Sequence, residues 1–166
     1  MIAIDLDGTL LRKDGRLGTK TVAAVEEATR QGIKVVVASA RAPRNTQQIY
    51  HRLRLNTWQI NHNGALVYDQ PSRQLIEHHP IDEQVARQVI ELARRVSKQV
   101  PIGVEVVDTL YTDAADRDLD RARMGLTDSG KPFNQLLDEP ITKIFMTGPP
   151  DQLGEIQSVI QQHLHG

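Results

Sequence analysis

The sequence predicts an α/β fold with a parallel sheet, followed by a separate α+β unit. A short apolar run, Met1 to Ile4, is typical of a buried strand. A helical period follows over 19–31, and a β-branched run over 33–38 is typical of a strand buried on both faces. Strand, helix and strand form a parallel unit with a right-handed crossover. The pattern changes near residue 80, which predicts one domain over 1–79 and a second over 80–166.

The composition is that of an ordinary soluble globular protein and excludes several classes of function. The chain has 166 residues, of which 39% are hydrophobic and 25% are charged. Its net charge of −1 gives no general attraction to nucleic acid or to an anionic membrane. The absence of cysteine excludes disulfides and a thiolate zinc site. No apolar run approaches membrane-spanning length, and acids interrupt the N-terminal segment, so we expect a cytoplasmic protein without membrane or nucleic-acid partners.

Two carboxylates, Asp5 and Asp7, follow the first strand one residue apart. Residues i and i+2 of a strand face the same side, so we expect the two carboxyl groups to be neighbours. Such a pair is electrostatically costly unless a cation lies between the acids, and an oxygen-lined site suits Mg²⁺. Gly8 then breaks the strand, and Thr9 adds a hydroxyl. The alternative is an acidic turn that caps a helix or binds a stray cation.

Local signals place the other elements of the first domain. Asp14-Gly15 is a tight-turn signal, and Thr19 is expected to cap the first helix. Pro43 suits the first turn of a second helix, which is expected to run to about residue 53. Ser39 therefore lies between a strand end and a helix N-terminus, where an anion can bind. A third strand is expected over 58–60, an Asn-Gly turn at 63–64 and an edge strand over 74–79.

The second domain is expected to alternate helices and strands. Asp82 is a suitable cap for a long amphipathic helix. The segment 113–123 carries four acids and three arginines, which indicates a solvated, ion-paired face. The expected elements are a helix over 82–99, a hairpin over 103–112, a loop over 125–132, a short helix over 133–137, a strand over 141–147 and a helix over 149–164.

Three short motifs resemble those of a known family. Ile4-Asp5-Leu6-Asp7-Gly8-Thr9 resembles the D-x-D-G-T motif of the haloacid dehalogenase-like hydrolase superfamily. The segment around Ser39 and Arg41 resembles A-T-G-R-P of the Cof-type phosphatase subgroup, with alanine in place of glycine before the arginine. Asn63-Gly64-Ala65 resembles the N-G-A segment of that subgroup. The resemblance implies a partial, Rossmann-like, three-layer core and, from the order of elements, a C2-type cap over 80–166.

The resemblance also implies roles for individual residues. Asp5 is the nucleophile that becomes an aspartyl-phosphate, and Asp7 is the general acid and base. Ser39 holds the transferring phosphoryl group, and both acids belong to the Mg²⁺ site. The residues implied to bind phosphate or substrate are Gly8, Thr9, Ser39, Arg41, Asn63 and Gly64. The implied reaction is hydrolysis of a small phosphorylated metabolite, such as a sugar phosphate or phosphoglycolate.

Two pieces that the family places after the cap are absent between Met1 and Gly166. They are a lysine that pairs with the nucleophile and an acidic cluster that completes the Mg²⁺ site. Lys143 falls within an expected cap strand, and Lys34 lies at the strand end opposite the acids. We therefore expect only the front half of the core and an impaired phosphatase. The alternative is an inactive remnant that binds phosphorylated ligands or acts only in an assembly.

The missing half of the core has a consequence for the first strand. We expect this strand to form an exposed, apolar sheet edge, which is a site for pairing with other chains. Two alternatives remain open at this point. Either the strand pairs with a second copy of the chain to form a homo-oligomer, or the C-terminal helix or a cap segment covers it.

Overall fold

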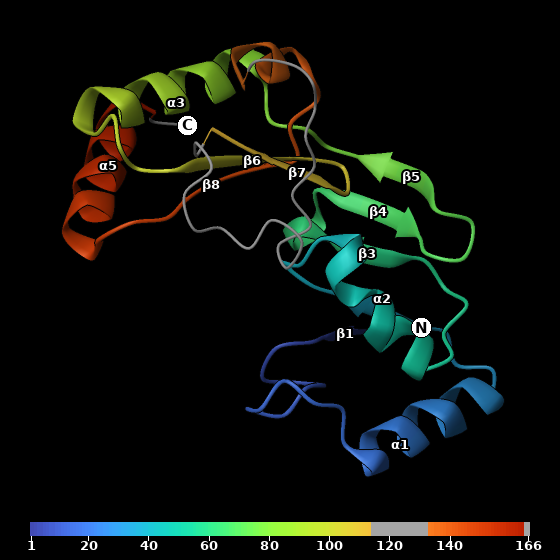
Figure 1. Ribbon diagram of the computed structural model, residues 1–166. Helices are drawn as coiled ribbons and strands as arrows, with labels where there is room; N and C mark the ends of the chain where they lie inside the picture. Colours follow the sequence, from blue (N-terminus) through green and yellow to red (C-terminus); the bar gives the residue numbers. More distant parts are fainter. Residues whose placement is uncertain (114–132, 165–166) are drawn as a thin grey trace. The chain divides into compact units, whose positions relative to one another are not determined.

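The computed structural model describes residues 1–113 and 133–164 of the chain. The chain, drawn in Figure 1, divides into two compact units, Met1–His79 and Pro80–Gly166. Each unit has its own hydrophobic core. The ion-paired face expected over 113–123, except for its first residue, and the loop expected over 125–132 lie outside the described residues. Among the described residues, no helix is both long enough and apolar enough to cross a membrane.

The first unit contains a five-stranded sheet that confirms the predicted α/β class. Its first three strands are parallel, and its last two are added antiparallel. Helices on the two parallel connections follow the strand-helix-strand pattern expected from the sequence. In spatial order the strands are β1 (Ile2–Asp5), β2 (Val35–Ala38), β3 (Gln59–Asn61), β4 (Leu66–Asp69) and β5 (Gln74–His78); the connecting helices are α1 (Thr19–Arg30) and α2 (Pro43–Arg52), and a short 3₁₀ turn η1 (His62–Gly64) follows β3.

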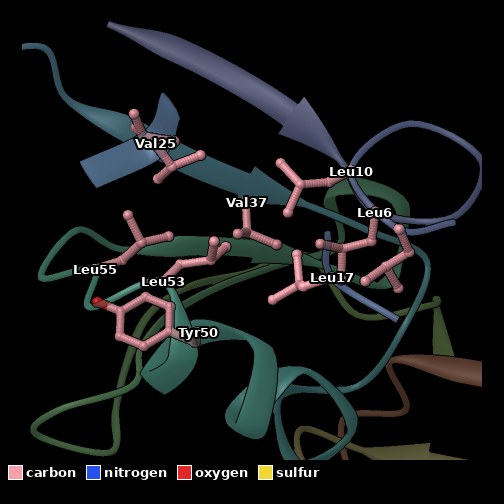
Figure 2. Packing of buried hydrophobic residues seen from close by; sticks show 10 residues of the cluster. Leu6, Leu10, Leu17, Val25, Val37, Tyr50, Leu53 and Leu55 are labelled. Carbon is pink, nitrogen blue, oxygen red and sulfur yellow. The ribbon is translucent and has the colours of Figure 1, made fainter. Parts of the chain in front are cut away.

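The core of this unit lies on one side of the sheet. Val35 and Val37 of β2 are 2% and 1% exposed, and apolar residues from both α1 and α2 pack against them. In Figure 2, leucines from the segment after β1 and side chains from the helices gather around Val37. Val36 and Ala38, which face the other side, are only half-buried. Burial of this strand is therefore confirmed for one face only, because both described helices of the unit pack on that face.

The start of α1 differs from the prediction. Thr19 is the first helical residue, and the N-cap is Gly18, which has no side-chain capping bond. A Cβ atom at position 18 would lie 3.1 Å from Nη2 of Arg12, so a side chain there would need a small shift of this exposed guanidinium. Pro43 begins α2, as predicted.

A buried polar chain joins α2 to β3. Gln59 has no exposed surface, and its Oε1 accepts a hydrogen bond from Thr46 Oγ1 at 2.8 Å. Its Nε2 donates to Oε1 of Gln70 at 2.6 Å. Buried amides and hydroxyls are costly when unpaired, and here each of the three side chains finds a partner.

The second unit contains a three-stranded antiparallel sheet covered by two helices (Figure 1). Asp82 caps the first of these helices, as predicted, and its Oδ1 accepts hydrogen bonds from two backbone N–H groups at 2.9 and 3.1 Å. Apolar residues of both helices and of the central strand form one core. The elements are α3 (Glu83–Val96), β6 (Ile102–Val106), β7 (Thr109–Thr112), η2 (Phe133–Asp138), β8 (Lys143–Met146) and α5 (Pro150–His163), with the strands in the order β7, β6, β8.

A glycine in β6 makes room for an aromatic ring of β8. Gly103 and Phe145 are register partners across the two strands. A Cβ atom built on Gly103 would lie 2.1 Å from Cζ of the Phe145 ring. The ring therefore occupies the space that any other side chain would need.

We expect Gly103→Ala to destabilise the second unit by about 2 kcal/mol, because the new methyl group overpacks against the ring. Gly154→Ala is the matched control, since a Cβ atom there meets nothing within 4 Å in helix α5. That change should stabilise the protein by about 0.5–1 kcal/mol. Urea denaturation of both variants measures the difference, and equal effects would contradict the close packing of Phe145 on Gly103.

The first strand lies at the edge of its sheet, as predicted, with Met1 90% exposed and Ile2 44% exposed. An edge strand presents unpaired N–H and C=O groups to other chains. We therefore predict that the protein self-associates through β1, so that its mass by light scattering rises with concentration. Ile2→Lys should reduce this association. Ile76→Lys, at a 38%-exposed position on the opposite edge strand β5, should not. A strictly monomeric protein at all concentrations would contradict the prediction.

Candidate active site

Strand β1 carries Asp5 to the end of the sheet where β2 also finishes. The parallel register pairs Asp5 with Ala38, the residue before Ser39. The two candidate residues therefore lie at the same edge of the sheet. Asp5 is exposed, and its Oδ2 accepts a long hydrogen bond from Thr9 Oγ1 at 3.4 Å. Thr9 thus contacts the expected nucleophile directly.

The chain turns immediately after Asp5, so Asp7 lies in a turn and not, as the sequence had suggested, on the strand. β1 ends at Asp5, so Asp7 does not continue the strand. Leu6, between the two acids, has no exposed surface and lies in the core, as Figure 2 shows. Its carbonyl accepts hydrogen bonds from the N–H groups of Thr9 and Leu11 at 3.4 and 2.8 Å. Gly8, with φ of +82°, allows this turn.

Asp7 forms a two-pronged ion pair with Arg41. Nε of Arg41 donates to Oδ2 of Asp7 at 2.9 Å, and Nη2 donates to Oδ1 at 2.6 Å. The two residues are 34 positions apart, so the pair joins the first motif to the loop after β2. The side chains are 34% and 57% exposed, which limits the contribution of the pair to stability to about 1 kcal/mol or less. Arg41 therefore contacts Asp7 here, whereas the sequence suggested only a substrate contact.

Ser39 lies at the end of β2 and is only 5% exposed. Its Oγ accepts a hydrogen bond from the N–H of Arg41 at 3.1 Å, and this contact leaves the hydroxyl proton available for donation. The backbone of Ser39 is joined to the next strand, since its N–H donates to the carbonyl of Ile60 and its carbonyl accepts from Asn63. The segments 39–41 and 60–63 therefore form one hydrogen-bonded rim at the strand ends.

The turn after β3 has left-handed backbone geometry at three successive residues. The φ angles of His62, Asn63 and Gly64 are +50°, +57° and +98°. This conformation suits Gly64, is tolerated by asparagine, and costs a residue such as His62 about 1–2 kcal/mol. Asn63 and Gly64 are exposed, and His62 is buried. The turn therefore presents the two candidate pocket residues to solvent beside Ser39.

Asn61 is a residue of the site that the sequence analysis did not single out. It has no exposed surface, and its Nδ2 donates to the backbone carbonyl of Arg41 at 3.0 Å. Among the described residues its Oδ1 is buried without a hydrogen-bond partner. The sequence could have pointed to Asn61, because it is a polar residue on the same side of strand β3 as Gln59, and both are buried.

The described residues at this site offer a metal ion one carboxylate that Arg41 does not occupy, that of Asp5. No group of three or more His, Cys, Asp or Glu side chains within 1–113 and 133–164 could hold a metal. Arg41 occupies both carboxylate oxygens of Asp7, which leaves the exposed carboxylate of Asp5. Because Mg²⁺ is often bound by one or two carboxylates together with waters and substrate phosphate, Asp5 suits an ion that arrives with a phosphorylated ligand.

The two lysines considered as substitutes, Lys143 and Lys34, lie in different units of the chain. Lys143 lies in β8 of the second unit, as predicted. The carbonyl of Lys34 accepts a hydrogen bond from the N–H of Ile2, so Lys34 lies beside the start of β1. Asp5 is at the other end of that strand.

A family model described as haloacid dehalogenase-like hydrolase matches residues 2–166. Among the similar curated proteins, Phosphatase YwpJ of Bacillus subtilis is 39% identical over 90 residues, which cover 54% of this chain and 31% of that protein. The 5-amino-6-(5-phospho-D-ribitylamino)uracil phosphatase YitU of the same organism is 27% identical over 172 residues, which cover 96% of this chain and 60% of that protein. The matched parts thus span 31% and 60% of the length of these two relatives.

Solved structures show the same fold. The crystal structure of a haloacid dehalogenase-like hydrolase from Bacteroides thetaiotaomicron matches with a TM-score of 0.79 at 19% identity, covering 97% of this chain and 62% of that one. A structure from Thermotoga maritima matches with a TM-score of 0.74 at 23% identity, covering 97% and 61%.

Proposed function

The chain belongs to the haloacid dehalogenase-like hydrolase family, and from this membership and the geometry at the ends of β1 and β2 we propose that it hydrolyses a small phosphorylated metabolite. The observation that carries the proposal is that Asp5, Asp7, Ser39 and Arg41 belong to one connected edge of the sheet. Relatives described as phosphatases support the reaction class, and among them are a pyridoxal phosphate phosphatase of Escherichia coli and the ribitylaminouracil phosphatase already mentioned. The cytoplasmic location expected from the sequence stays a prediction.

The proposed reaction has two steps on the same carboxylate. A carboxylate oxygen of Asp5 attacks the phosphorus atom, and the bond from phosphorus to the leaving oxygen breaks while Asp7 gives that oxygen a proton. Asp7 then takes a proton from water, and the water oxygen attacks the phosphorus of the aspartyl-phosphate. The bond to Asp5 breaks, and inorganic phosphate leaves. The Ser39 hydroxyl, at the same edge, donates to a phosphoryl oxygen throughout.

Charge neutralisation is the main demand of phosphoryl transfer. In the proposed site, Asp5 and the backbone carbonyl of Asp7 would hold Mg²⁺, which supplies positive charge to the phosphoryl oxygens when bound. Asn63 and Gly64 on the exposed turn after β3 line the substrate pocket in this proposal.

The second unit is proposed to be the cap that selects the substrate. Its order of elements, with α3, two hairpin strands, a third strand and the terminal helix α5, supports this assignment. The natural substrate is proposed only as a class, a small phosphate monoester.

A second candidate function is binding of phosphorylated ligands without turnover, in a protein that acts only as part of an assembly. One observation favours it. Within the described parts of the chain no third acidic group joins Asp5 and Asp7, so Mg²⁺ and the phosphoryl charge are held by few groups. The two candidates differ in a single measurable property, the release of inorganic phosphate.

We predict that the protein hydrolyses p-nitrophenyl phosphate in the presence of Mg²⁺ and that Asp5→Asn lowers the turnover at least about a hundredfold, because the amide cannot attack phosphorus. Asp151→Asn makes the same change of charge at an exposed position of helix α5 and should leave turnover unchanged. Equal background rates in the wild type and in Asp5→Asn would reject the catalytic proposal and favour the binding candidate.

A further inference from the structure

We propose that Arg41 is a positioning residue for Asp7, and that Asn61 holds Arg41 in that position. The inference rests on the proposed function, because it takes Asp7 as the acid and base of the reaction. The role proposed for Arg41 differs from the one expected from the sequence, which was to bind phosphate or substrate.

The first observation is the shape of the ion pair. Nε and Nη2 of Arg41 donate to the two different oxygens of Asp7, at 2.9 and 2.6 Å. A planar guanidinium that engages both oxygens fixes the plane of the carboxyl group as well as its position. Asp7 is more than half exposed and follows the end of β1, so neighbouring side chains alone would leave it several rotamers.

The second observation is that the backbone of Arg41 is anchored on both sides. Its N–H donates to Oγ of Ser39 at 3.1 Å. Its carbonyl accepts from Nδ2 of Asn61 at 3.0 Å and from the N–H of His62 at 3.4 Å. The side chain that holds Asp7 therefore starts from a backbone fixed to the ends of β2 and β3.

The third observation concerns the cost of Asn61. This side chain has no exposed surface, and its Oδ1 has no hydrogen-bond partner among the described residues. A buried, unpaired acceptor lowers stability, and an apolar side chain of similar shape would avoid that cost. The contact that asparagine provides and leucine cannot is the hydrogen bond to the Arg41 carbonyl.

The proposed chain of contacts has a kinetic consequence. A general acid must lie within hydrogen-bond reach of the leaving oxygen, and a small displacement lowers the rate steeply. Both oxygens of Asp7 accept from Arg41, so one of them must leave Arg41 and carry the proton that passes to the leaving oxygen, while the other stays on Arg41. Without Arg41 the carboxyl group of Asp7 can turn away from the leaving oxygen, so loss of Arg41 should slow the reaction of substrates whose leaving group needs a proton. Substrates with good leaving groups should be affected little.

The kinetic test compares kcat/KM for phenyl phosphate, a poor leaving group, and 2,4-dinitrophenyl phosphate, a good one. Arg41→Gln should lower kcat/KM about a hundredfold for phenyl phosphate and less than about threefold for the dinitrophenyl ester. Arg41→Lys should restore only part of the loss, because an ammonium group cannot hold both oxygens of Asp7. Arg30→Gln removes another arginine–carboxylate pair, on helix α1, and should change neither substrate.

Equal losses on both substrates would show that Arg41 binds the phosphoryl group and would overturn the proposal. No loss on either substrate would overturn it as well. Asn61→Leu should show the same dependence on the leaving group, about tenfold in size, without a lower melting temperature. An equal effect on both substrates in this variant would refute the part assigned to Asn61.

A second measurement does not depend on turnover. In nitrogen-15 NMR spectra the Nε–H proton of Arg41 should exchange slowly with water, and Asn61→Leu should speed the exchange about tenfold or more. Asn45→Ala, on the exposed face of α2, should leave it unchanged. Fast exchange in the wild type, or an unchanged rate in Asn61→Leu, would overturn the proposed contacts. A wild type without Asp5-dependent turnover would reject the proposed function, while the exchange rates would still decide the geometry.

Discussion

The parallel pairing of β1 with β2 is the contact on which the candidate site depends. It places Asp5 beside Ala38, so that the loops after the two strands begin at the same edge of the sheet. Alternate residues over 4–6 have different roles. Ile4 and Leu6 pack in the core, and Asp5 between them is exposed. The core and the site therefore depend on the same few positions. A change that loosened Leu6 would move both acids, although it touches neither carboxylate.

Much of the fold could be predicted from the sequence because its signals are local. The β-branched run of β2, the proline that begins α2 and the cap at Asp82 each depend on neighbours within a few residues. The ion pair of Asp7 with Arg41 could not be predicted in the same way, since it depends on the path of two loops that are 34 residues apart. The cap of α1 was placed one residue too late, because Thr19 has the more typical capping side chain whereas the N-cap is Gly18, which has none.

The ion pair of Arg41 with Asp7 leaves the candidate site short of positive charge for a phosphoryl group. Arg41 is paired with Asp7, so its positive charge is not directed at a phosphoryl group in this structure. A dianionic ester at this edge therefore needs compensation from a cation held at Asp5 or from groups beyond the described contacts. The chain spans 31% and 60% of the two Bacillus relatives, which are themselves described as phosphatases. The proposed hydrolysis requires that the negative charge of the phosphoryl group be balanced at this site.

The buried chain of Thr46, Gln59 and Gln70 has a consequence for how the molecule reaches its native state. β3 has only three residues and a single parallel register pair with β2. The pattern of apolar residues in so short a strand distinguishes the native register poorly from shifted registers. Sliding β3 by one residue would bring Ile60 to the side of Thr46 and turn the amide of Gln59 away from both partners. Misaligned intermediates would then carry unpaired polar groups during folding. The hydrogen bonds of these three side chains thus favour the native register of β3 over misaligned ones. They contribute more to the uniqueness of the fold than to its free energy of unfolding.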